Sequence, residues 1–181
     1  MLSITIPAIE GWDEENERFT ILAEEVKLEL EHSLVAISKW ESKWHKPFLT
    51  KDEKSSEEIM DYIKFMTLTK NVDPLVYNRL TEDNVKAVDA YLQDPMTATT
   101  ISKDKLGKPN REIVTAEIIY YWMTALNIPF QCEEWPIKRL LTLVQVCNIK
   151  NSPSKKRKMS DTLSRYSAAN AARKKNLNTR G

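Results

Sequence analysis

Glycine, histidine and cysteine are scarce in this chain of 181 residues, and their scarcity removes several classes of chemistry. The three glycines, Gly11, Gly107 and Gly181, can form neither the glycine-rich phosphate loop of nucleotide-binding proteins nor a dinucleotide fingerprint. The two histidines, His32 and His45, and the two cysteines form no CxxC or HxxxH pair. We therefore expect no metal site and no cofactor.

Long apolar runs are also missing. The longest apolar stretch, residues 118–130, is interrupted by Thr124, Asn127 and Pro129, and it is too short to span a bilayer. The first residues are β-like and lack the basic and apolar regions of a signal peptide. Two cysteines in the whole chain fit a reducing compartment. These features predict a soluble, intracellular protein that does not enter a membrane.

Candidate catalytic residues are few. The chain contains adjacent glutamates at Glu24-Glu25, Glu57-Glu58 and Glu133-Glu134. General acid–base catalysis requires two carboxyl groups whose surroundings move their pKa values apart. Adjacent glutamates in polar stretches are more typical of a solvated surface. We therefore expect no catalytic residues and no enzymatic activity.

The charges are divided unevenly along the chain. Residues 150–181 contain ten Lys or Arg against one acidic residue, Asp161, which gives this segment a charge of +9. Because the whole chain carries only +1, residues 1–149 carry −8. An acidic body with a basic tail indicates a protein that binds a partner.

The first thirty-two residues are β-rich. Leu2–Ile6 and Val26–Glu31 alternate apolar and polar side chains, and a period of two is typical of a strand with one buried face. Phe19–Leu22 is expected to form a third strand. Gly11–Asn16 has the composition of a turn.

From Ser33 onward, apolar residues recur at helical spacing. Helices are expected to begin at Ser33, at Ser55 with Glu58 in a capping box, at Pro74 and at Thr81. Pro47 is expected to end the first of them. The inward faces of the second and fourth helices are expected to contain Ile59, Tyr62, Ile63, Met66, Val85, Val88 and Leu92.

The densest apolar region is residues 115–149. Ala116–Leu126 is apolar almost all round and predicts a buried central helix. A second helix is expected from Trp135-Pro136, antiparallel to the first, and the pair is expected to form the centre of the core. Residues 97–115 before them are expected to form a β-hairpin or an exposed loop. The fold class is therefore α+β, mainly α, with one globular domain at 1–149 (β-rich 1–32, helical 33–149).

Trp40 and Trp44 are the candidate contact residues of this domain. Aromatic residues at helical spacing are usually core residues, because each buries a large area. These two lie among Lys39, Glu41 and Lys43, on a helix whose other faces are charged. They therefore either cap the core or belong to an interface, where Trp is enriched.

The tail, residues 150–181, is the second candidate contact region, flexible or conditionally helical. Its basic residues fall in two groups, Lys155, Lys156, Arg157 and Lys158, then Arg173, Lys174 and Lys175. Residues 160–176, which include the second group, predict a helix that is marginal in isolation. Three interpretations stay open: a solvated tail, a segment that neutralises nucleic-acid phosphates, or a segment that folds along an acidic partner or another copy.

Three blocks of the sequence resemble a known group of proteins: 28–47 (LELEHSLVAISKWESKWHKP), 118–129 (IIYYWMTALNIP) with 139–143 (RLLTL), and 170–181 (NAARKKNLNTRG). Together they resemble proteins of the structural gene modules of tailed bacteriophages, and most of all the tail assembly chaperones of long-tailed phages.

This resemblance implies a mainly helical protein that binds the tape measure protein or the tail tube subunits during assembly. It also implies action in the host cytoplasm, absence from the finished virion and no catalytic residues. The β-rich beginning departs from an all-helical family. It is also compatible with a permanent virion subunit, such as a head–tail connector or tail protein, whose basic tail docks on a neighbouring subunit.

Overall fold

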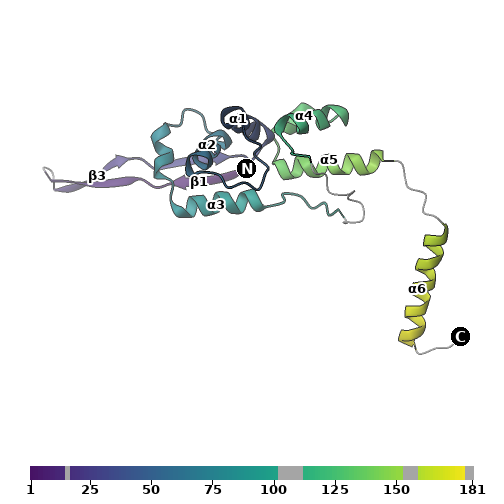
Figure 1. The fold of residues 1–181 in the computed structure, drawn as a ribbon. Coiled ribbons are helices and arrows are strands. Elements are labelled where there is room, and N and C mark those ends of the chain that lie inside the picture. Colours follow the sequence, from purple (N-terminus) through teal and green to yellow (C-terminus); the bar gives the residue numbers. More distant parts are fainter. Residues whose placement is uncertain (15–16, 102–111, 153–158, 178–181) are drawn as a thin grey trace. The chain divides into compact units, whose positions relative to one another are not determined.

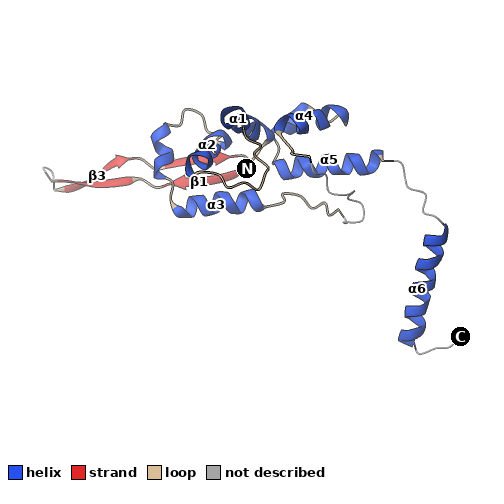
Figure 2. Ribbon diagram, viewed as in Figure 1, coloured by secondary structure: helices blue, strands red, loops and turns tan. Residues whose placement is uncertain are grey.

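The computed structural model describes residues 1–14, 17–101, 112–152 and 159–177. The chain divides into two compact units, Met1–Ile149 and Lys150–Gly181. The fold is α+β and mainly α, with 55% helix and 16% strand, as the sequence predicts. Short strands come first and helices follow (Figure 1, Figure 2).

The first sheet pairs β1 (Leu2–Ile6) with β4 (Val26–Leu30) in antiparallel register, with Leu2 opposite Leu30 and Ile6 opposite Val26. The alternation predicted from the sequence is confirmed, because Ile4, Ile6, Leu28 and Leu30 are buried and the residues between them are exposed. Both outer edges of this sheet are engaged. Leu68 N–H donates to the Glu29 carbonyl, and the Asn84 amide donates to the Thr5 carbonyl.

The second sheet is a hairpin of β2 (Ile9–Asp13) and β3 (Arg18–Ala23). The prediction of a turn over Gly11–Asn16 is therefore wrong for Gly11, Trp12 and Asp13, which belong to β2. The physical reason is cross-strand packing: Trp12 pairs with Phe19, and the Leu22 side chain lies against Gly11. A Cβ on Gly11 would lie 2.6 Å from Leu22 Cδ1, so a larger residue here would require the exposed Leu22 side chain to move.

Four helical segments follow, each with a side-chain cap near the predicted residue. They are α1 (Leu34–Trp44), α2 (Ser56–Met66), the 3₁₀ helix η1 (Pro74–Arg79) and α3 (Glu82–Gln93). Ser33, Ser55, Asp73 and Thr81 accept the capping hydrogen bonds, and α1 ends at His45, whose φ is 52°, before Pro47. Two residues predicted to point inward are largely exposed, Ile59 at 46% and Val85 at 43%.

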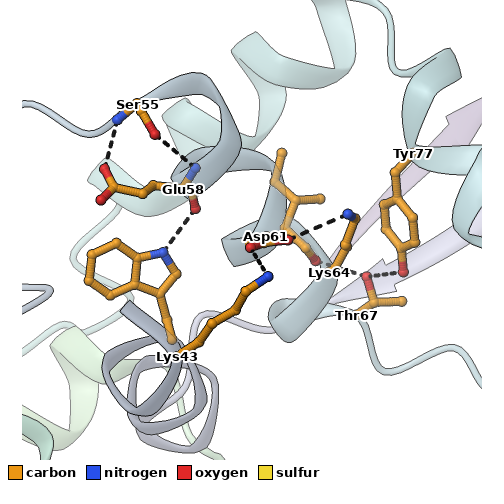
Figure 3. Close-up of polar contacts among 9 residues, drawn as sticks. Lys43, Ser55, Glu58, Asp61, Lys64, Thr67 and Tyr77 are labelled. Carbon is orange, nitrogen blue, oxygen red and sulfur yellow. Dashed lines mark hydrogen bonds and ion pairs between the residues drawn. The ribbon is translucent and has the colours of Figure 1, made fainter. Parts of the chain in front are cut away.

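Polar contacts tie α2 to its neighbours (Figure 3). The capping box joins Ser55 and Glu58, and the Asp61 carboxylate pairs with Lys43 of α1 and with Lys64. Glu58 is buried, and its carboxylate accepts a hydrogen bond from Lys46 at 2.6 Å. This contact holds the pKa of Glu58 below its ordinary value.

The last elements of the first unit are α4 (Ala116–Ala125), the 3₁₀ helix η3 (Phe130–Glu134) and α5 (Ile137–Asn151). The prediction that α4 is a buried central helix is wrong, because only Ala116, Ile119 and Met123 of this helix are buried and Tyr121 is 69% exposed. The centre is α1, which packs against α2, α4 and η3. Most of the largest fully buried side chains come from the first sheet, α1 and α2: Ile6, Leu28, Leu30, Leu34, Ile37, Trp40, Ile63 and Met66.

The second unit contains α6 (Met159–Leu177), which agrees with the helix expected over 160–176. Of the segment expected to form a hairpin or loop, residues 97–101 and 112–115 contain no strand. Residues 102–111 lie outside the described part of the chain.

Candidate interaction surfaces

The hairpin of residues 9–23, here called the arm, projects beyond the helices of the first unit (Figure 1). Strand alternation places Trp12, Phe19, Ile21 and Glu10 on one face, because Trp12 lies opposite Phe19 and Glu10 lies opposite Ile21. The rings of Trp12 and Phe19 meet edge to face with centroids 5.1 Å apart. This face is here called the apolar face of the arm.

The apolar side chains of the arm are mostly in solvent. Trp12 is 55% exposed, Phe19 69%, Ile21 64% and Leu22 69%. Leu22 lies on the opposite face, against Gly11. Trp12, Phe19 and Ile21, which share the apolar face, leave on the order of 400 Å² of apolar surface exposed there, a size that on a monomer often marks a functional patch. A two-stranded hairpin alone is only marginally stable in water, so a partner covering this face would also stabilise the arm.

The base of the arm is fixed to the body by Arg79 at the end of η1. Its guanidinium donates to the carbonyl oxygens of Pro7 and, at 2.9 Å, of Glu24. These two residues lie just outside the two ends of the arm in the sequence. A single planar group therefore holds both strands where they leave the first sheet, which directs the arm away from the body.

An apolar cleft lies elsewhere on the first unit, between the 49–51 loop, the 112–114 segment, α4 and α5. Its volume is about 680 Å³, within the range of roughly 300–1,000 Å³ that is usual for binding pockets. The apolar lining comes from Leu49, Ile113, Val114, Trp122, Leu141 and Val144. This cleft is a second surface that a partner side chain could fill.

The two tryptophans proposed as contact residues have different environments. Trp40 is 1% exposed, and its indole N–H donates to the Glu58 carbonyl at 2.9 Å, so it is a core residue and the contact prediction is wrong for it. Trp44 is partly buried, with its ring centroid 6.5 Å from that of Trp40. Among the described residues, its indole N–H has no hydrogen-bond partner. Trp44 therefore lies at the border of the core.

The basic residues of the tail are described only in part. Lys155, Lys156, Arg157 and Lys158 lie outside the described residues. Arg173, Lys174 and Lys175 are exposed near the C-terminal end of α6, where cations interact favourably with the helix dipole. The same helix exposes Leu163, Tyr166 and Leu177. α6 thus presents apolar and basic side chains together.

One buried pair of titratable groups is structural. His32 Nδ1 is hydrogen-bonded to the Tyr62 hydroxyl, and both side chains are buried. Burial, assisted by the charge of Lys138, lowers the pKa of His32 to about 4, and burial raises the pKa of Tyr62. The imidazole is therefore neutral at pH 7. The pair joins the end of β4 to α2.

No group of three or more His, Cys, Asp or Glu side chains within the described ranges is placed to hold a metal ion. Cys132 and Cys147 are free thiols. Over the same residues, no helix is long and apolar enough to cross a membrane.

Sequence reasoning missed the arm as a surface. The signal was the spacing of two residues between Glu10 and Trp12 and between Phe19 and Ile21, on either side of the acidic sequence 13–17. Because Gly11 is typical of a turn, the first of these strands was not predicted.

No protein-family model, curated protein or solved structure matches the chain.

Proposed function

We propose that this chain is a non-enzymatic assembly protein of a tailed bacteriophage that binds the tape measure protein or tail tube subunits. The observation that carries the proposal is the arm, which exposes Trp12, Phe19 and Ile21 on one face and is clamped at its base by Arg79. The resemblance of three sequence blocks to tail assembly chaperones supports the choice of partner.

The physical basis is the match between the arm and an aggregation-prone partner. Aromatic residues are enriched at the centres of protein interfaces, because they bury a large area at a small entropic cost. A long polypeptide that exposes apolar segments before assembly is stabilised against aggregation when such segments are covered. The arm provides a surface that covers them.

Co-expression tests the proposal directly. The tape measure protein of the same phage is produced with the wild-type chain, with the Trp12→Ser/Phe19→Ser/Ile21→Ser variant, or with a Leu75→Ser/Tyr121→Ser control. Leu75 and Tyr121 are 68% and 69% exposed, which matches the arm residues. Soluble tape measure protein should co-purify with the wild type and the control and be reduced at least tenfold with the arm variant. Equal recovery with all three chains would contradict the proposal.

A second candidate is a permanent virion subunit, a head–tail connector or tail protein. The clamped arm favours it as well, because a projecting hairpin can dock on a neighbouring subunit. Quantitative mass spectrometry of purified particles and infected-cell lysate separates the two functions. A chaperone is present in the lysate and absent from particles, whereas a subunit is present in particles at a fixed copy number.

A further inference from the structure

The two sheets of the first unit differ in whether their edges form hydrogen bonds with other parts of the chain. The edges of the β1–β4 sheet are engaged by Leu68 and Asn84. The arm consists of β2 and β3 alone, and among the described residues no strand pairs with the outer edge of either. An unpaired edge presents a row of backbone donors and acceptors to any extended chain.

The arm has only part of the usual protection of such edges. Natural sheets prevent edge pairing with charged side chains, lysine above all, with proline, with β-bulges or with a covering loop. Residues 9–23 contain neither lysine nor proline. The register shift between Ile9 and Glu10 is close to the body, so it leaves the outer part of β2 regular. The composition of the arm therefore permits strand addition.

The negative charge of the arm indicates which kind of partner strand could pair with it. Residues 9–23 contain five acidic residues and one arginine, which gives the segment a charge of −4. Glu10 lies on the apolar face beside Trp12, and β2 carries Glu10 and Asp13, whereas Arg18 lies on β3. The β2 edge is thus the acidic one. Another arm would meet like charge there, because the whole of residues 1–149 carries −8.

We propose that the β2 edge accepts an extended partner segment of alternating apolar and basic side chains as a third strand. Main-chain hydrogen bonds give this mode its affinity and alternate side chains give it specificity. The apolar side chains of the added strand extend the surface of Trp12, Phe19 and Ile21. Its basic side chains point to the opposite face, which is the face of Asp13 in β2. This inference rests on the proposed function and names the part of the assembly partner that the arm binds.

Synthetic peptides test the inference on the full-length chain. The probes are a capped, fluorescently labelled ten-residue peptide of alternating Lys and Val, the same peptide with Glu for Lys, and the Lys-Val peptide N-methylated at alternate residues. Fluorescence anisotropy should show the Lys-Val peptide binding at least tenfold more tightly than either of the others. The N-methylated peptide keeps its side chains and loses its backbone donors, so equal binding of this peptide would overturn strand addition.

Two variants locate the site. Phe19→Ser/Ile21→Ser should weaken Lys-Val binding at least tenfold, whereas Leu75→Ser/Tyr121→Ser should leave it unchanged. Asp13→Lys lies on the opposite face, keeps the apolar face unchanged and should move the preference toward the Glu-Val peptide. Absence of any peptide binding, with arm-dependent capture of the tape measure protein retained, would overturn the inference and leave the proposed function standing.

Discussion

Glu41 of α1 accepts a hydrogen bond from the backbone N–H of Ala116, the first residue of α4, at 2.7 Å. Its second carboxylate oxygen accepts the backbone N–H of Phe48 at 2.7 Å. Thr115, which precedes α4, provides no side-chain cap. A buried carboxylate from the central helix therefore caps a helix that follows it by 75 residues.

Removing this carboxylate should destabilise the first unit. Glu41→Ala leaves two backbone donors without their charged acceptor, at a cost of about 3 kcal/mol, and Glu41→Gln should cost about half as much because one acceptor oxygen remains. Urea unfolding measures both values. Glu117→Gln, at an exposed position in the first turn of the same helix, removes only a favourable interaction with the helix dipole and should change the free energy of unfolding by less than about 1 kcal/mol. A loss below 1 kcal/mol for Glu41→Ala would contradict the capping role.

Stability should decrease in mild acid because of His32. The pKa of His32 is about 4 in the folded chain and near 6.5 when unfolded. Between these values the unfolded chain binds a proton that the folded chain does not. The free energy of unfolding should therefore fall by about 3 kcal/mol as the pH decreases from about 6.5 to about 4.

Two substitutions isolate this contribution. His32→Gln should flatten the pH dependence over that window, whereas His45→Gln, at an exposed position, should retain it. Denaturant unfolding at pH 7, 6, 5 and 4 gives the free energy of unfolding of each chain at each pH. The same slope in His32→Gln as in the wild type would show that another group causes the acid sensitivity.

Loss of the Arg79 clamp should loosen the arm without unfolding the body. Arg79→Ala removes the donor shared by Pro7 and Glu24, and charged hydrogen bonds of this kind contribute roughly 1.5–3 kcal/mol. Amide hydrogen exchange should accelerate over β2 and β3. The first sheet and α1 should exchange at rates much closer to those of the wild type. As a surface control, Lys86→Ala removes only exposed ion pairs and should leave the exchange of the arm unchanged.

Neutralising the first basic group of the tail should leave folding intact. Lys155→Ala/Lys156→Ala/Arg157→Ala/Lys158→Ala changes no residue of the 1–149 unit, which contains the buried apolar core. Thermal unfolding followed by circular dichroism should remain cooperative, with an unchanged midpoint. A loss of cooperativity would contradict a domain boundary near Asn151.

The features that could be predicted from the sequence are those with local causes. The capping box of Ser55 and Glu58 depends on residues three apart, and the alternation of β1 and β4 depends on a period of two. The strand assignment of Gly11 depends on its pairing with Thr20 of β3, and Trp40 donates to a carbonyl of α2. Local patterns contain no information on such distant contacts. For the same reason Trp40 and Trp44, one helical turn apart, could not be distinguished.

Site-specific photocrosslinking shows whether the arm contacts an assembly partner in cells. Benzoylphenylalanine is placed at Phe19 of the arm or, as a control, at Tyr121 of α4, in cells that also produce the tape measure and tail tube proteins. We expect a crosslink from position 19 to one of these proteins and none from position 121. A crosslink from position 121, with none from position 19, would show that the arm does not bind the partner.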